Sequence, residues 1–257
     1  MSKVYEYKSF DDDVVTTAGQ NYELPEGYRY VRDRWWERLW SSFLLGIFRV
    51  VARIWLRFGL DASFVGREKL LEVPGDSGFF VYGNHTQEFG DPMIAIALGL
   101  RPVRRRVCAV CSPSNLGVPV IGSMLPYLGA IPIASGLEGL RRTEEAIGWC
   151  CDHARPVVIF PEAHVWPWYT GIRPYSSVSF HYPVKEKLPV FSMTVTYRKR
   201  RFGRRPQAVI YIDGPWLPDP ALSERARKNQ LCGIVRKAME SHLAESDYSY
   251  AEYRKVD

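Results

Sequence analysis

The chain has 257 residues, which is long enough to bury a substantial hydrophobic core in one large domain or two small ones. Its net charge is +6, and aromatic residues make up 14% of it, with eight tryptophans and fifteen tyrosines. The positive charge suits an anionic partner, such as phospholipid headgroups or a phosphorylated small molecule. A basic protein also raises nucleic acid as a partner, but the sequence contains no recognisable nucleic-acid-binding module, so we do not expect one.

Residues 1–34 are polar and rich in tyrosine, with an acidic patch at Asp11-Asp12-Asp13. They lack the basic start and short apolar core of a secretory signal. We predict an arm that becomes ordered only where it packs on the rest of the protein.

The spacing of apolar and charged residues in residues 35–60 predicts one amphipathic helix or two. Arg49, Arg53 and Arg57 recur every four residues and fall on one stripe. The apolar residues of another face are Leu39, Phe43, Ile47, Val50, Ile54 and Phe58. The uninterrupted apolar run, residues 43–48, is far shorter than the roughly 20 residues of a membrane-spanning helix.

Two roles are open for this helix. Its tryptophans are typical of a membrane interface, where the arginines can meet lipid phosphates; these residues are Trp35, Trp36, Trp40 and Trp55. Alternatively, the apolar face packs on the protein core, which composition alone predicts equally well.

From residue 61 onward, strand-like and helix-like segments alternate. Strands are predicted at residues 63–65, 78–82, 103–110, 129–133, 157–160, 190–197 and 208–212. Helices are predicted at residues 91–99, 114–125, after Ser135, and 219–243. This alternation predicts an α/β sandwich with a mostly parallel central sheet flanked by helices.

The predicted strand 78–82 leads into a loop that contains His85 and ends at Asp91-Pro92. Ligands of open α/β sheets usually bind at the carboxyl ends of the strands, so an imidazole there is well placed for chemistry. Asp91 could fix the tautomer of His85, with Glu88 as a rival partner. The alternative is that Asp91 only caps the next helix and His85 is structural.

Five cysteines are present, at positions 108, 111, 150, 151 and 232. Cys108-Ala-Val-Cys111 has no second Cys or His pair at zinc spacing, and the set does not form a disulfide framework. We therefore expect buried, reduced thiols in an intracellular protein, with no metal and no cofactor.

An ordered series of motifs resembles the lysophosphatidic acid (1-acylglycerol-3-phosphate) acyltransferase family. The motifs are Asn84-His85 with Asp91-Pro92, Leu128-Gly129-Ala130-Ile131-Pro132-Ile133, Phe160-Pro161-Glu162 and Leu188-Pro189-Val190. The resemblance implies that His85 is the general base on an acceptor hydroxyl and that Asp91 orients it. The family usually has four residues between the His and the Asp; here there are five, and Gly90 could absorb the extra one in a bulged loop.

The resemblance also directs attention to residues that would bind the acceptor. The family's arginine after the Ile-Pro is missing, which leaves Arg141 and Arg142 as substitutes unless they form a solvated helix face. The family's Phe-Pro-Glu-Gly-Thr becomes Phe160-Pro161-Glu162-Ala163-His164. In an extended chain Glu162 and His164 would point to the same side and bind the acceptor together. Arg173 is a further candidate for an anion.

These observations predict an O-acyltransferase with an arm (1–34), a membrane-interface segment (35–60) and a catalytic domain (61–257). The resemblance implies transfer from acyl-CoA or acyl carrier protein to a lysophospholipid, with lysophosphatidic acid as the default acceptor, in phospholipid biosynthesis. It also favours peripheral or monotopic attachment to the cytoplasmic face of an anionic membrane. The alternatives are a metal-dependent hydrolase that uses His85, Glu88, Asp91, Glu162 and His164, and a catalytically silent membrane-binding protein.

Overall fold

A computed structural model describes residues 3–15, 22–100 and 103–256. Its main sheet has seven strands in the order β2-β8-β7-β3-β6-β4-β5. The strands are β2 (Ser63–Val65), β3 (Phe79–Gly83), β4 (Cys108–Cys111), β5 (Ala130–Pro132), β6 (Pro156–Ile159), β7 (Val190–Arg198) and β8 (Gln207–Trp216). Strands β7, β3, β6, β4 and β5 run parallel, whereas β8 is antiparallel to β7 and β2 follows the direction of β8.

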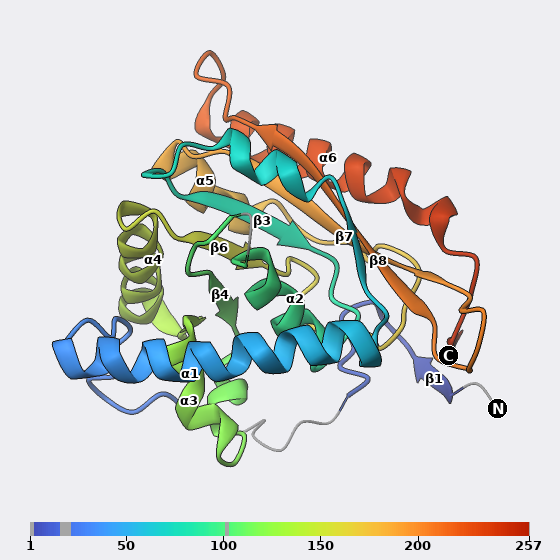
Figure 1. Cartoon of the computed structure of the whole chain (residues 1–257). Helices are drawn as coiled ribbons and strands as arrows, with labels where there is room; N and C mark the ends of the chain where they lie inside the picture. Colours follow the sequence, from blue (N-terminus) through green and yellow to red (C-terminus); the bar gives the residue numbers. More distant parts are fainter. Residues whose placement is uncertain (1–2, 16–21, 101–102, 257) are drawn as a thin grey trace.

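Strands β3 and β6 are made almost entirely of apolar residues because helices cover both faces of the sheet (Figure 1). Every residue of β3 and of β6 is buried. Successive side chains of β3 enter different layers: Phe79 and Val81 pack on one face, and Phe80 and Tyr82 on the other. Strand β3 therefore lies at the centre of the molecule.

The helices form two layers. Along the chain they are α1 (Trp35–Ile54), which continues as a π-helical turn (Trp55–Gly59), α2 (Gly90–Leu98), α3 (Ile121–Leu128), α4 (Gly136–Asp152), α5 (His181–Glu186) and α6 (Glu224–Ser241). Buried residues of α2 and of the π-helical turn after α1 pack with Phe79 and Val81. Buried residues of α4, α5 and α6 pack with Phe80 and Tyr82. Short 3-10 turns are Arg67–Glu72, Pro113–Gly117, Val178–Phe180 and Leu243–Glu245.

The predicted α/β fold with a mostly parallel sheet is confirmed. Some elements differ from the prediction. Strand β4 begins only at Cys108, and α3 begins after Pro119. Helix α5 was missed because it has only six residues. The last helix was predicted to begin at Asp219, but α6 begins at Glu224. Ser223 is its N-cap residue, and the Ser223 hydroxyl accepts from the amide of Ala226.

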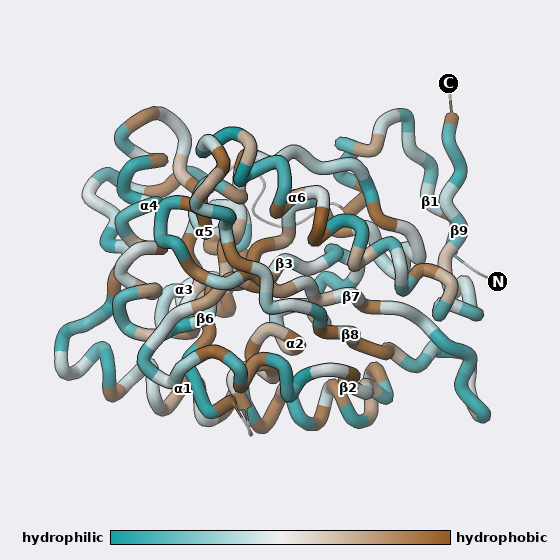
Figure 2. The backbone as a smooth tube through the Cα atoms, turned by 90° about the horizontal axis from the view of Figure 1, so that it is seen from above, coloured by the Kyte–Doolittle hydropathy of each residue, from teal (hydrophilic) through white to brown (hydrophobic). Residues whose placement is uncertain are grey.

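Helix α1 packs one side on α2 and α3 and leaves a long apolar side uncovered. The buried residues of α1 are Glu37, Ser41, Leu44, Leu45 and Ala52. The exposed apolar stripe comprises Trp36, Leu39, Trp40, Phe43, Ile47, Val50, Ile54 and Phe58, and Figure 2 shows apolar residues recurring along the helix. By length and composition alone, the helical segment 35–59 could cross a membrane. The short uninterrupted apolar run at residues 43–48 did not indicate this.

The N-terminal arm packs on the far end of the chain. Strand β1 (Lys3–Tyr7) pairs in parallel with β9 (Ala251–Lys255). Trp166 donates its indole N–H to the carbonyl oxygen of Asp12 at 3.0 Å. Its ring lies 4.7 Å from that of Tyr7 and 4.9 Å from that of Tyr253, between centroids. The arm is thus ordered over residues 3–15 by an aromatic cluster that local sequence patterns do not indicate.

Candidate active site

The loop after β3 is fixed to β7 by the side chain of Asn84. Its amide nitrogen donates to the carbonyl oxygen of Val195 at 3.0 Å, and its oxygen accepts from the amide of Val195 at 2.8 Å. Backbone pairing of β3 with β7 ends at Gly83 opposite Met193. The Asn84 side chain thus continues the pairing of the two strands by one step, and it holds the start of the His85 loop.

His85 and Asp91 are in direct contact. His85 Nδ1 lies 2.7 Å from Asp91 Oδ2. The same oxygen accepts the backbone amides of Thr86 and Gln87, both at 2.9 Å. Three N–H donors around one buried oxygen favour its negative charge and place the His85 proton on Nδ1. Nε2 is then the basic nitrogen of the ring, and the side chain of His85 is 21% exposed.

The extra residue between His85 and Asp91 is accommodated differently from the prediction. Gly90 has no positive φ and begins α2, with Phe89 as its N-cap residue. A Cβ on Gly90 would lie 2.7 Å from the Cβ of Gln87, so glycine is required for space and not for conformation. Glu88, the rival partner of His85, is exposed to solvent.

Tyr197 anchors the same loop from β7. Its hydroxyl lies 2.7 Å from Thr86 Oγ1 and accepts from the side-chain amide of Gln87 at 2.8 Å. Tyr197 is fully buried, and burial raises the pKa of its hydroxyl. It lies 111 residues from Thr86 in the sequence. Sequence reasoning missed this positioning residue, because no local pattern connects β7 to the loop.

The loop after β6 covers the His85 loop from the other side. The Phe160 ring stacks on the imidazole of His85 with centroids 4.6 Å apart. The amide of Trp166 donates to the carbonyl oxygen of His85 at 3.0 Å, and the amide of Trp168 donates to that of Thr86 at 2.9 Å. Two loops that follow neighbouring strands therefore hold the imidazole in one orientation.

Glu162 and Arg173 form a buried ion pair beside this loop. Arg173 Nε lies 3.1 Å from Glu162 Oε2, and the amide of Arg173 donates to Oε1 at 3.2 Å. Burial raises the pKa of the Glu162 carboxyl to about 7, although the Arg173 charge and the backbone amides of Arg173 and His85 act in the opposite direction. Glu162 thus joins the loop after β6 to the backbone of His85.

This pairing differs from the expected acceptor-binding roles of Glu162 and Arg173. The Arg173 side chain is only 1% exposed, and it donates to the carbonyl oxygens of Phe10 and His164 as well as to Glu162. As folded, its guanidinium is covered by the arm and the β6 loop. The guanidinium of Arg173 thus binds groups of the protein itself, whereas the sequence predicted that it would bind an anion.

The side chains of His164 and Glu162 do not lie together. The chain turns at Ala163, whose φ is +65°, and the amide of His164 donates to the carbonyl oxygen of Glu162 at 2.8 Å. The His164 ring therefore faces Asp13, with Nδ1 3.8 Å from a carboxylate oxygen, while the Glu162 carboxylate is buried. The expected same-side arrangement required an extended chain, which this turn prevents.

Arg141 and Arg142 lie on the exposed side of α4, and both pair with carboxylates of their own helix. Arg141 Nε is 2.9 Å from Glu138 Oε2, and its guanidinium also contacts Glu145. Arg142 Nε is 2.8 Å from Glu138 Oε1. This is the solvated helix face that the sequence left as the alternative.

The metal-ligand arrangement is not formed. Within the described residues there is no group of three or more His, Cys, Asp or Glu side chains that could hold a metal ion. Of the five expected ligands, Glu162 pairs with Arg173, His164 faces Asp13 and Glu88 is exposed.

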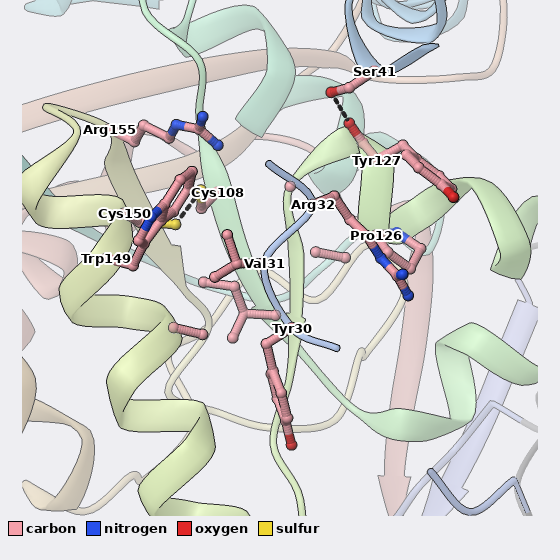
Figure 3. A pocket seen from close by; sticks show the side chains of 14 residues that line it. Tyr30, Val31, Arg32, Ser41, Cys108, Pro126, Tyr127, Trp149, Cys150 and Arg155 are labelled. Carbon is pink, nitrogen blue, oxygen red and sulfur yellow. Dashed lines mark hydrogen bonds between the residues drawn. The ribbon is translucent and has the colours of Figure 1, made fainter. Parts of the chain in front are cut away.

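A small cavity of about 30 Å³ lies at the amino ends of the strands, the edge of the sheet opposite to His85. It is lined near β4 and β5 by Cys108, Ile131 and Tyr127, and Arg155 precedes β6 (Figure 3). The sulfurs of Cys108 and Cys150 are in contact there. This volume has room for about one water molecule, so it is not a site for a lipid.

The sheet order and the two helical layers define an α/β sandwich with a mostly parallel central sheet. The structure is similar to the crystal structure of the 1-acyl-sn-glycerophosphate (LPA) acyltransferase, PlsC, from Thermotoga maritima, with a TM-score of 0.57. The match covers 81% of this chain and 83% of that one at 17% sequence identity. No family model and no curated protein sequence matches the chain. The resemblance that the motifs indicated is thus confirmed by the fold.

Proposed function

We propose that this protein is an O-acyltransferase that moves a fatty acyl group from a thioester to a hydroxyl of a lysophospholipid or related glycerolipid. The observation that carries the proposal is the contact of His85 with Asp91 beyond the central strand. The similar fold of an LPA acyltransferase supports it. The motif resemblance makes acyl-CoA or acyl carrier protein the donor and lysophosphatidic acid the first acceptor to test.

His85 and Asp91 suffice for the proton transfers of this reaction. Neutral Nε2 removes the proton of the acceptor hydroxyl as its oxygen attacks the thioester carbonyl, and Asp91 stabilises the imidazolium that forms. The tetrahedral intermediate then expels the thiolate, which takes the proton back from His85. The acceptor is itself the nucleophile, so no serine or cysteine of the protein has to form an acyl intermediate.

Membrane attachment is the second part of the proposal. The apolar stripe of α1 is uncovered, although the opposite side of the same helix is packed on the protein. Such a helix lies in the plane of a membrane interface, with its tryptophans at the headgroup level. We infer peripheral or monotopic attachment, on the cytoplasmic face, where a soluble thioester donor can reach the site.

The test is to offer purified protein a panel of lysolipids with acyl-CoA and acyl carrier protein donors and to detect acylated products by mass spectrometry. We expect one acceptor class to be acylated, and we expect His85→Ala to abolish the product. Acylation of only those acceptors that lack a phosphate would contradict the proposed substrate but agree with the mechanism. Full activity of His85→Ala would exclude the mechanism, and no transfer to any acceptor would leave the catalytically silent membrane-binding protein as the better description.

A further inference from the structure

The connection between β7 and β8 is a basic hairpin with an aromatic tip. Its sequence is Lys199-Arg200-Arg201-Phe202-Gly203-Arg204-Arg205-Pro206. Residues 201–205 are all exposed, and the Phe202 side chain is 78% exposed. Gly203 has a φ of +89°, which lets the chain turn sharply after the phenylalanine.

This hairpin is tied to the protein on two sides. Arg200 Nη2 donates to the carbonyl oxygen of Gly59 at 3.0 Å. On the other side, the amide of Lys199 donates to Asp247 Oδ1 at 2.8 Å, and the Tyr248 hydroxyl donates to the carbonyl oxygen of Arg204 at 3.1 Å. The hairpin therefore projects in a defined direction.

The cations at the tip differ from those at the base. Arg198 pairs with Glu245, and Arg200 lies 3.8 Å from Asp61. Within the part of the chain that the structure describes, no carboxylate pairs with the three tip arginines, Arg201, Arg204 and Arg205. An exposed aromatic side chain among arginines that have no carboxylate partner is well suited to a surface that is both apolar and anionic.

The tip lies beside the end of the apolar stripe of α1. The Arg200 bond to Gly59 joins the hairpin to the residue after Phe58, whose side chain is 74% exposed. The amide of Ala208, on the returning strand, donates to the carbonyl oxygen of Leu60 at 2.9 Å. Figure 1 shows β7 and β8 reaching the same end of the molecule as the C-terminal end of α1. The two exposed apolar features therefore adjoin.

We propose that the hairpin tip, residues 201–205, is a second membrane contact that acts together with α1. Phe202 enters the interfacial region, and the guanidinium groups of Arg201, Arg204 and Arg205 bind the phosphates of anionic lipid headgroups. The bilayer is favoured over a nucleic acid because the tip carries an exposed phenylalanine and continues an apolar helix face. This inference rests on the membrane attachment proposed above, but it does not depend on acyl transfer.

The second contact has a consequence for the candidate active site. Strand β7 is parallel to β3, so its end points toward the edge of the sheet where His85 lies. From Met193, opposite Gly83, to Arg198 the strand continues for five residues, which span about 17 Å. One contact through α1 leaves the protein free to rotate about the helix axis. A second contact at the hairpin prevents that rotation and holds the His85 edge in a fixed orientation to the lipid surface.

The test is vesicle co-sedimentation of the full chain with phosphatidylglycerol-containing and with purely phosphatidylcholine vesicles. The variants are R201Q/R204Q/R205Q and F202S. The matched controls are K187Q/R225Q/K237Q, which removes three exposed cations, and V178S, which removes a side chain that is 76% exposed on the α5 and α6 side of the sheet. Thermal unfolding checks that every variant is folded.

We expect the triple arginine variant to bind anionic vesicles on the order of 100-fold more weakly at low salt, since each arginine near an anionic surface contributes about a fivefold factor. F202S should weaken binding to both vesicle types, and the two controls should bind as the unchanged protein does. If the tip variants bind anionic vesicles like the controls, the proposal is wrong. The same holds if they lose affinity only for acyl carrier protein or for nucleic acid.

A comparison with α1 separates this inference from the proposed function. If F43S/I47S on α1 loses vesicle binding while the tip variants do not, the attachment stands and the hairpin contact fails. If the tip variants lose binding while His85→Ala binds normally without turnover, both proposals stand. If His85→Ala keeps full turnover and the tip variants still lose binding, the hairpin contact stands and the catalytic mechanism fails.

Discussion

At the scale of single residues, the contact between His85 Nδ1 and Asp91 Oδ2 has a directly measurable consequence. In Asp91→Asn the amide can no longer hold the charge that stabilises the imidazolium, and its NH₂ group competes with the amides of Thr86 and Gln87. We expect kcat to fall roughly 10²- to 10⁴-fold with a much smaller change in KM. Glu88→Gln is the matched control, because Glu88 is exposed, and it should retain its activity. Equal losses in the two variants would contradict the assignment of Asp91.

The buried carboxyl of Glu162 predicts a pH dependence of stability. Burial raises its pKa from 4.5 to about 7, so between these two values the folded state holds a proton that the unfolded state has released. The contribution of this group to the free energy of unfolding is therefore fully present below about pH 4.5 and is lost as the pH rises through about 7. We expect Glu162→Gln to remove that part of the slope in urea unfolding measured from pH 4.5 to 8. Parallel curves for the variant and the unchanged protein would show that Glu162 is ionised throughout.

The contacts of the site residues were predictable from the sequence where both residues belong to one motif. They were not predictable where two distant segments of the chain meet. His85 and Asp91 share one loop, so their spacing indicated the contact that the structure contains. The Glu162 pair with Arg173 depends on how the β6 loop folds back, and the Tyr197 anchor depends on strand order. No periodic pattern of residues in the sequence indicates either contact.

At the scale of elements, α1 is predicted to bind membranes through side chains that contribute little to folding. Phe43 and Ile47 lie on the exposed stripe, away from the side that packs on α2 and α3. Phe43→Ser with Ile47→Ser should weaken vesicle binding by roughly two orders of magnitude, because each removed side chain loses about 1.5 kcal/mol of burial in lipid. Flotation assays measure this loss.

The matched control for α1 is Leu44→Ser, on the buried side of the same helix. It should lower the thermal unfolding midpoint and leave the vesicle affinity of the folded fraction unchanged. The reverse pattern, with Phe43→Ser and Ile47→Ser unfolding the protein, would mean that the stripe is covered by protein in solution. The sequence predicted the helix and its apolar face, but only the structure showed which face is covered.

At the scale of the whole molecule, the two ends of the chain are joined through the aromatic cluster on Trp166. Tyr7 and Phe10 place their rings 4.7 and 5.8 Å from that ring. Tyr7→Ala with Phe10→Ala should lower the free energy of unfolding by about 1 to 3 kcal/mol, because the rings lose both burial and mutual contact. Urea unfolding of the full chain measures the change, with Val4→Ala, an exposed residue of the same strand, as the control.

The arm also reaches the candidate site through the loop after β6. The carbonyl oxygen of Phe10 accepts from Arg173, which holds Glu162, and the amide of Trp166 donates to the His85 carbonyl. The alanine variants keep that carbonyl but lose the rings that pack the arm on Trp166. We therefore expect Tyr7→Ala with Phe10→Ala to lower kcat as well, by a smaller factor than Asp91→Asn. Unchanged kcat in a clearly destabilised variant would show that the site is held by the sheet alone.

The sequence by itself determined the alternation of strands and helices, the amphipathic helix and the His85 loop, because each follows from the period of apolar residues or from one short motif. The tertiary structure decided the order of the strands, the covering of the loop by the β6 segment and the arm, and the neighbours of Arg173 and Arg200. These depend on contacts between residues far apart in the chain. The free energy of such contacts comes from packing and burial in the assembled core, which no local pattern encodes.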